Sequence, residues 1–283
     1  MRDTSLPPTA DIRGGATAKP LQAMRLARVG LHLLYGAATV AAIYPFVTCA
    51  RRRWLKQRWS QQLLEILNIR LERYGVAPAP ASLLVANHVS WLDIYVINAC
   101  CPSAFVSKDD VRHWPLIGWL AARTETLFLQ RGSRRHAHAM SEAVGAVLNG
   151  GGNVAVFPEG TTTDGLAVRH FHAALLQPAI DAGRPVQPMA LRYLTPQGEY
   201  CGAPAYVGDT TLLQCLKAIL AQPTIVAALH IMPPMDAATR TRRALADAAH
   251  GLIAAHVQEF YPVAETSSVE GYIYEPTPAK AGI

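Results

Sequence analysis

The chain has 283 residues, enough to bury a full core in one large domain or two small ones. Hydrophobic residues make up 51% and charged residues only 16%, against about a quarter in a typical soluble domain, so the composition indicates contact with lipid or an unusually apolar surface. The net charge of +6 fits an anionic membrane surface or a phosphorylated substrate, whereas the lack of basic stretches interleaved with aromatic residues argues against a nucleic-acid partner.

The N-terminal part combines a polar leader with a long apolar run. Residues 1–24 are rich in Pro, Gly, Thr and Ala, which predicts a disordered leader. Residues 29–50 contain no Asp, Glu, Lys or Arg, and as a helix they would extend about 33 Å, enough to cross a bilayer core. Because His32 and Pro45 interrupt the run, a helix dipping into one leaflet is an alternative, and a buried core helix is another.

Basic residues follow the apolar run at once. Arg51, Arg52 and Arg53 argue against a cleaved signal peptide. The positive-inside tendency then predicts an inner-membrane protein whose remaining chain faces the cytoplasm.

Apolar residues recur at every fourth position between residues 54 and 75, which predicts an amphipathic helix. The repeating residues are Leu55, Trp59, Leu63, Leu67 and Leu71. With its basic residues, such a helix can lie in a membrane interface, or it can pack on a globular domain. Residues 25–75 are therefore predicted to form membrane-associated helices.

Short apolar runs alternate with helical segments over residues 76–264. The strand candidates are 82–86, 104–107, 126–130, 154–157, 186–193 and 224–231, and the helix candidates are 91–100, 110–122, 134–148, 171–182, 211–221 and 237–259. Asp236 is the expected N-cap of the last helix. This alternation predicts an α/β fold with a mixed, largely parallel sheet flanked by helices, behind the N-terminal membrane-associated helical segment. Residues 265–283 lack periodicity and read as a loose tail.

The stretch NHVSWLD places an ionisable pair, His88 and Asp93, among apolar residues. Five residues along one straight helix would leave the two side chains about 140° apart. They can meet if His88 lies in a strand-to-helix turn and Asp93 lies in the first turn of the helix. A carboxylate bound to one imidazole nitrogen fixes the tautomer and makes the other nitrogen a better base, although a capping or core role for His88 is equally compatible with the spacing.

Three further stretches carry polar groups at strand ends or an unusual proline. Arg131 ends a predicted strand, where an arginine can hold a phosphate through two hydrogen bonds. FPEGTTTDG, which includes Glu159, Gly160 and Thr161, offers backbone N–H groups and hydroxyls to a charged ligand. Pro188, inside the apolar run VQPMAL, is expected at a sheet edge or a bulge because proline cannot donate to the ladder.

Taken in order, NHVSWLD, TLFLQR, FPEGT and VQPMA resemble the four sequence blocks of the glycerolipid acyltransferase family of the 1-acyl-sn-glycerol-3-phosphate acyltransferase type. The resemblance covers roughly residues 82–195. It implies that a fatty acyl group moves from a thioester of acyl carrier protein or coenzyme A to the hydroxyl of a lysolipid, such as lysophosphatidate giving phosphatidic acid. It further implies a membrane-associated enzyme without a metal or a bound cofactor.

The resemblance also assigns roles to single residues. It implies that His88 is the general base, that Asp93 orients it, and that Arg131 binds the acceptor phosphate. It implies that Glu159, Gly160 and Thr161 bind the acceptor and shape the loop.

Two positions depart from the family pattern. Thr162 stands where the family often has arginine or serine, and His172 stands where it often has lysine. Both changes remove a possible phosphate contact, and FPEGTTTDG together with HWPLIGWLA looks like the lyso-ornithine lipid branch of the family. We favour lysophosphatidate as acceptor because Arg131 would supply the main phosphate contact.

Other classes of function find less support in the sequence. The chain has neither a G-x-S-x-G elbow nor a P-loop, and its five cysteines form no C-x-x-C pair, which favours reduced thiols over disulfides or zinc. A metal hydrolase would draw on His88, Asp93, His136 and His138. A non-catalytic membrane tether would explain the N-terminal segments but not the four ordered blocks.

Overall fold

The structure is a computed structural model that describes residues 16–129 and 134–260. Its strands are β1 Ile69–Gly75, β2 Leu83–Ala86, β3 Ser103–Lys108, β4 Thr126–Leu129, β5 Asn153–Val156, β6 Val186–Leu194 and β7 Ile225–Ile231. Its α-helices are α1 Lys19–Ala42, α2 Cys49–Ile66, α3 Asp93–Cys100, α4 Ile117–Arg123, α5 Arg134–Asn149, α6 Gln177–Asp181, α7 Leu212–Ala221 and α8 Arg242–Phe260. Three 3₁₀ turns occur at η1 Tyr44–Phe46, η2 Asp109–His113 and η3 Ala173–Leu176.

The strands of the described chain form one sheet in the order β1-β7-β6-β2-β5-β3-β4. The β6–β7 pair is antiparallel and all other pairs are parallel. The mixed, largely parallel α/β fold predicted from the sequence is therefore confirmed, and each predicted strand has its counterpart in the sheet.

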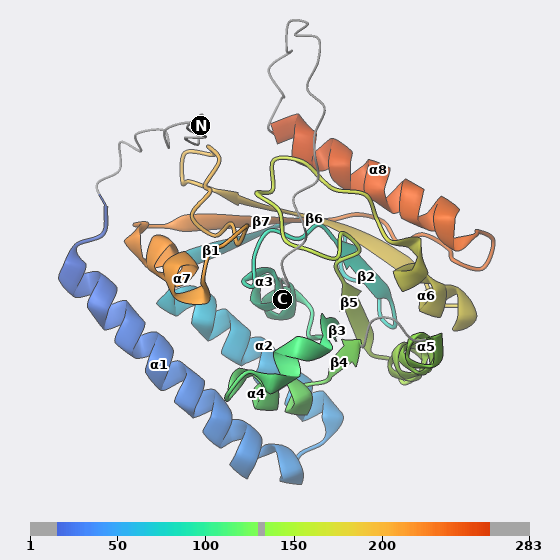
Figure 1. Ribbon diagram of the computed structural model, residues 1–283, viewed down its shortest axis with the longest axis horizontal. Coiled ribbons are helices and arrows are strands. Elements are labelled where there is room, and N and C mark those ends of the chain that lie inside the picture. Colours follow the sequence, from blue (N-terminus) through green and yellow to red (C-terminus); the bar gives the residue numbers. More distant parts are fainter. Residues whose placement is uncertain (1–15, 130–133, 261–283) are drawn as a thin grey trace, which may run out of the picture.

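Helices cover both faces of the sheet (Figure 1). On one face, side chains of α2, α3 and α7 form a core with alternate residues of the strands, and α1 lies outside α2. On the other face, α5, α6 and α8 pack against the intervening strand residues. Because successive side chains of a strand point to opposite faces, buried strands such as β2 contribute to both cores.

The predicted helix over residues 54–75 is wrong beyond residue 66. Helix α2 ends at Ile66, Asn68 adopts a positive φ of 57°, and β1 then pairs in parallel with β7. Residues 69–72 alternate apolar and polar side chains, so a period of two competes here with the four-residue leucine repeat. Leu71 therefore belongs to the sheet, and residues 25–75 are not wholly helical.

The expectation of an edge position for Pro188 is wrong, because β6 is a central strand that is buried along its whole length. The alternative, a bulge, is confirmed: antiparallel pairing resumes between Val186 and Met235, so two residues of β6 lie opposite the three residues 232–234. Pro188 sits where pairing with β7 ends, since the β6–β7 register begins at Met189. Its carbonyl still accepts the N–H of Met232 at 3.0 Å. Pro188 has no N–H to donate to the Met232 carbonyl. That carbonyl accepts a hydrogen bond from Gln187 Nε2 instead, at 3.0 Å.

The apolar N-terminal run forms a helical hairpin rather than one helix over residues 29–50. Helix α1 begins at Lys19, so residues 19–24 are helical, contrary to the prediction of a disordered leader; it ends at Ala42, and Pro45 lies in the turn η1 before α2. His32 is buried against α2, where its Nε2 lies 2.9 Å from the Trp59 carbonyl and its ring stacks on that indole. His32 therefore faces the partner helix.

Three predicted helices differ from the observed elements. The one over 171–182 is the 3₁₀ turn η3 followed by the short helix α6. The segment predicted as a helix over 110–122 is interrupted at Trp114–Leu116, because proline at 115 disfavours a helical residue before it. The last helix begins at Arg242 and not after Asp236. The Asp236 carboxylate accepts the N–H of Ala238 in a local turn, while Thr241 Oγ1 accepts the N–H of Ala244 and caps α8.

Candidate active site

His88 and Asp93 meet at the carboxyl end of β2. His88 lies in the turn that follows β2, and Asp93 is the first residue of α3. The His88 Nδ1 and Asp93 Oδ2 atoms are 2.8 Å apart, and both side chains are buried. The strand-to-helix turn thus brings together two groups that one straight helix would separate.

The Asp93 carboxylate is surrounded by hydrogen-bond donors. Besides the His88 ring, Oδ2 accepts the backbone N–H groups of Val89 at 2.7 Å and Ser90 at 3.0 Å. Oδ1 accepts from the Tyr193 hydroxyl at 2.7 Å. These contacts satisfy a carboxylate that has no exposure to solvent, which a buried charge requires.

The His88 ring has one nitrogen bound to Asp93 and one edge on a cavity. The ring stacks on Phe157 with centroids 3.9 Å apart, and His88 lines the cavity described below. A carboxylate at Nδ1 assigns the proton of the neutral ring to that nitrogen. Nε2, for which the described chain offers no hydrogen-bond partner, is then the basic atom.

Glu159, in the segment after the neighbouring strand β5, holds the turn that contains His88. Because β2 and β5 are parallel neighbours, the segments after them meet at one edge of the sheet. Glu159 Oε1 accepts the His88 N–H at 2.7 Å, and Oε2 accepts the Arg169 N–H at 2.9 Å. Burial raises the pKa of the Glu159 carboxyl to about 7. Both oxygens have internal partners, so the predicted acceptor contact of Glu159 stays a prediction.

The rest of the FPEGTTTDG loop is fastened to the same turn. Gly160 has a φ of 68°, the left-handed region that favours glycine. The Thr163 N–H donates to the His88 carbonyl at 2.8 Å, and the Thr162 hydroxyl donates to the Tyr206 carbonyl. Gly160 and Thr161 lie beside these anchors, and their predicted acceptor contacts stay predictions.

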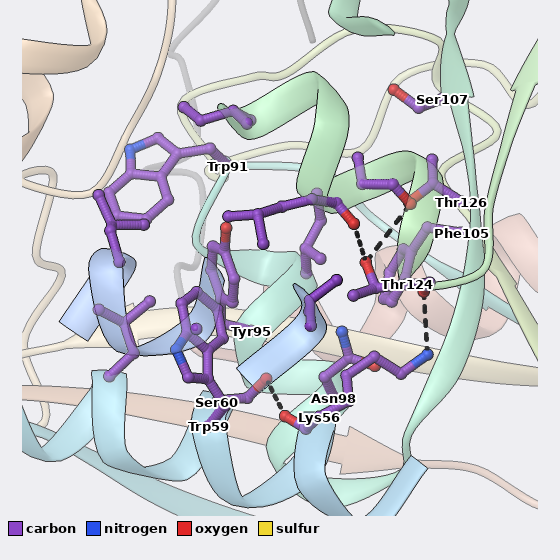
Figure 2. A pocket seen from close by; sticks show the side chains of 18 of the residues that line it. Lys56, Trp59, Ser60, Trp91, Tyr95, Asn98, Phe105, Ser107, Thr124 and Thr126 are labelled. Atoms are coloured by element: carbon purple, nitrogen blue, oxygen red, sulfur yellow. Dashed lines mark hydrogen bonds between the residues drawn. The ribbon is translucent and has the colours of Figure 1, made fainter. Parts of the chain in front are cut away.

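A largely apolar cavity of about 320 Å³ opens beside His88. It lies among α1, α2, α3, α4 and α7, with Trp59, Trp91 and Tyr95 on one side (Figure 2). Lys56 and Thr124 lie on the opposite side. The sequence did not predict this cavity, because its walls come from helices far apart in the chain.

Lys56, a basic residue of α2, points into the protein. Its side chain is only 8% exposed, and Nζ donates to Glu125 Oε2 and to the Ser103 carbonyl, each at 2.9 Å. Lys56 therefore ties α2 to the sheet at the polar side of the cavity.

Three further residues bear on the site: Arg131, which the sequence predicted, and Tyr193 and Tyr206, which it did not. Arg131 follows β4 but lies outside the described residues, so its role stays a prediction. Tyr193 and Tyr206 escaped prediction, although VQPMALRY contains the first of them.

Among the residues described, no three His, Cys, Asp or Glu side chains are grouped to hold a metal ion, and His138 pairs with Glu142 on the exposed side of α5.

Known proteins are similar to this chain in sequence and in fold. The sequence model of the family described as "Acyltransferase" matches residues 68–192. A lyso-ornithine lipid O-acyltransferase of Pseudomonas aeruginosa is 41% identical over 174 residues, which span 62% of this chain and 66% of that protein, just under two thirds. A 1-acyl-sn-glycerol-3-phosphate acyltransferase of Neisseria meningitidis is 40% identical over 188 residues, which span 65% of this chain and 73% of that protein.

A solved structure supports the fold independently. The crystal structure of the 1-acyl-sn-glycerophosphate acyltransferase PlsC from Thermotoga maritima superposes with a TM-score of 0.66 over 88% of this chain and 97% of that chain, at 19% identity. The 40% identity to the Neisseria protein, together with the four sequence blocks in their usual order, establishes the family of this chain. The chain belongs to the glycerolipid acyltransferase family.

Proposed function

We propose that the chain transfers a fatty acyl group from the thioester of acyl carrier protein or coenzyme A to the free hydroxyl of a lysolipid, foremost 1-acyl-sn-glycerol-3-phosphate to give phosphatidic acid. The observation that carries this proposal is the buried His88–Asp93 pair in the wall of an apolar cavity. The names of the Neisseria and Pseudomonas relatives support the same reaction class.

In the proposed reaction, His88 Nε2 removes the proton of the acceptor hydroxyl while the oxygen attacks the thioester carbonyl. Asp93 stabilises the imidazolium that forms and holds the ring in place. Collapse of the tetrahedral intermediate breaks the C–S bond, and the imidazolium returns its proton to the leaving thiolate. The donor already carries an activated acyl group, so the proposal needs no metal or bound cofactor.

Transfer is proposed to be direct, without an acyl-enzyme. Ser90, the hydroxyl nearest to His88 in sequence, is fully buried and is not among the residues that line the cavity. The apolar walls formed by Trp59, Trp91 and Tyr95 suit an acyl chain, because burying methylene groups there removes them from water.

The membrane-facing element of the proposal is α1. Among the described residues, Lys19–Phe46 is the helical segment long and apolar enough to cross a membrane, and 28% of its most apolar window is buried. Its N-terminal end nevertheless lies on the catalytic domain, since Thr17 N donates to the Ala221 carbonyl, and its C-terminal end turns back into α2, where Tyr44 bonds Arg52. We propose that α1 lies along the domain within one leaflet, on the cytoplasmic side of the inner membrane, and does not span it.

Polar substitutions on the outer face of α1 are expected to weaken membrane binding. Leu31 and Leu34 are 66% and 62% exposed, so Leu31→Glu with Leu34→Glu places two charges where lipid should be without emptying the core. Flotation with vesicles containing phosphatidylglycerol measures the effect. Leu252→Glu on α8, at the opposite face of the sheet, is the matched control and should float like the parent protein. Equal flotation of all three proteins would contradict the placement of α1.

A second acceptor, lyso-ornithine lipid, is supported by the bonding of the FPEGTTTDG loop. The Thr162 hydroxyl is engaged by the Tyr206 carbonyl, so it is not a free donor for a phosphate. The Pseudomonas relative carries this activity in its name. The acceptor head group therefore divides the proposal into two cases with the same chemistry at His88.

Arg131 separates the two acceptors. With lysophosphatidate, Arg131→Ala should raise the acceptor KM strongly, and Arg131→Lys should restore only part of the affinity, because lysine lacks the planar two-pronged donor. With zwitterionic lyso-ornithine lipid the dependence should be weaker. Lipid mass spectrometry after incubation with each acceptor and an acyl thioester gives the readout, and Arg240→Ala in the loop before α8 is the control. Efficient acylation of lyso-ornithine lipid alone would reverse the choice of acceptor.

A further inference from the structure

Strand β6 holds both ends of the turn that carries His88. At the start of the turn, the Asn87 side chain accepts the Leu191 N–H at 2.8 Å and donates to the Leu191 carbonyl at 2.9 Å. At its end, the Tyr193 hydroxyl donates to Asp93 Oδ1 at 2.7 Å. Leu191 and Tyr193 lie two residues apart on one face of the central strand, so a rigid element fixes both ends of the turn.

The Tyr193 contact defines the plane of the Asp93 carboxylate. Oδ2 is held by the His88 ring and by two backbone N–H groups of the turn. Tyr193 reaches the other oxygen from β6, about 100 residues away in the chain. With both oxygens held, the carboxylate cannot rotate away from Nδ1 without breaking bonds on two elements.

Tyr193 donates a hydrogen bond to this carboxylate at every pH below the raised pKa of its phenol. Its side chain is buried, and burial together with the Asp93 charge raises the pKa of the phenol well above its ordinary value. The hydroxyl therefore stays protonated. The other titratable groups around the pair are Cys215 of α7, whose pKa is raised by burial, and Glu159, which bonds the His88 N–H.

We infer that Tyr193 is a positioning residue for acyl transfer, whose hydroxyl sets the orientation and the basicity of His88 through Asp93. The inference rests on the proposed role of His88 as general base. A donor on Oδ1 draws charge from the carboxylate, so Asp93 stabilises the imidazolium less than an unbonded carboxylate would. Loss of the hydroxyl should let the carboxylate rotate, which orients His88 less well, and should leave more negative charge on Asp93, which makes the imidazolium harder to deprotonate.

Tyr193→Phe tests the inference with the full-length protein in mixed micelles, with palmitoyl-coenzyme A and lysophosphatidate as substrates. We expect kcat to fall about tenfold, as for the loss of one hydrogen bond to a charged group, with both KM values unchanged. The acid limb of the kcat/KM profile should move to higher pH, because His88 must lose its proton to act. A merely structural defect would lower the rate without moving this limb.

Tyr74→Phe is a closely matched control. Tyr74 lies on β1 of the same sheet and also donates its hydroxyl to a carboxylate, that of Glu72, but it is exposed and far from the cavity in the strand order. Its rate and pH profile should equal those of the parent. A double-mutant cycle adds a second test: in an Asp93→Asn background, Tyr193→Phe should cost less than about twofold, since the two residues act as one unit.

Several results would overturn the inference. Parent-like kinetics of Tyr193→Phe, a change confined to KM, or additive losses in the cycle would each show that Tyr193 does not act through Asp93. If Tyr193→Phe does not fold, 3,5-difluorotyrosine at this position keeps the hydroxyl and strengthens it as a donor, and the acid limb should then move to lower pH; an unmoved limb counts against the inference. A parent protein that shows no acyl transfer, or a His88→Ala protein that transfers the acyl group at the parental rate, would instead contradict the proposed function.

Discussion

His88→Ala is expected to lose about 10²–10⁴-fold in turnover, the range that general-base catalysis contributes. The acceptor hydroxyl holds its proton tightly, and Nε2 of His88 is the basic atom at the cavity wall. Substrate KM values should change little, because the lost interaction forms as the proton moves. Initial rates of acyl transfer to lysophosphatidate, measured on protein with parent-like circular dichroism, give the comparison.

His138→Ala is the control for this substitution. His138 is 77% exposed on α5 and contacts Glu142 on the same helix, so its removal should leave the rate unchanged. A folded His88→Ala protein that turns over at the parental rate would rule out the proposed mechanism.

Asp93→Asn should reduce turnover by about 10³–10⁴-fold, a loss comparable to that seen when the aspartate of a serine-protease triad becomes asparagine. The asparagine amide would face donors that now bond a carboxylate, namely the Val89 and Ser90 N–H groups and the His88 ring. Either the amide or the ring must rotate, and the Nδ1–H tautomer loses its acceptor. The same mismatch should lower the free energy of unfolding by about 1–3 kcal/mol.

The two effects of Asp93→Asn can be measured separately. Urea unfolding gives the stability change, and rates at substrate saturation give the catalytic change. Asp181→Asn, at an exposed site whose carboxylate accepts from Ser141 and Gln177, should alter neither by a comparable amount. Retention of at least half of the parental turnover in a folded Asp93→Asn protein would show that His88 keeps its orientation without the carboxylate.

Local patterns predicted the strands well because buried parallel strands carry their own signal. Segments such as β2 and β5 are short runs of aliphatic residues bounded by polar turns, and this composition suits burial on both faces. The same patterns were misleading where two periods overlapped: the four-residue leucine repeat continues into β1, and only pairing with β7 shows that Leu71 belongs to a strand. For Pro188 the sequence allowed an edge or a bulge, and only the register between β6 and the segment after β7 shows that the bulge occurs, and that it occurs in a central strand.

The amino-acid sequence by itself determined the α/β class, the order of the four blocks, and the pairing of His88 with Asp93, because each depends on residues close together in the chain. The tertiary structure alone decided what surrounds that pair. Tyr193 reaches Asp93 from β6, Glu159 holds the turn from the segment after β5, and the cavity has walls from helices α1, α2, α3, α4 and α7. These contacts join residues about 70 to 100 positions apart, and their existence depends on strand order and helix packing, which no local periodicity encodes.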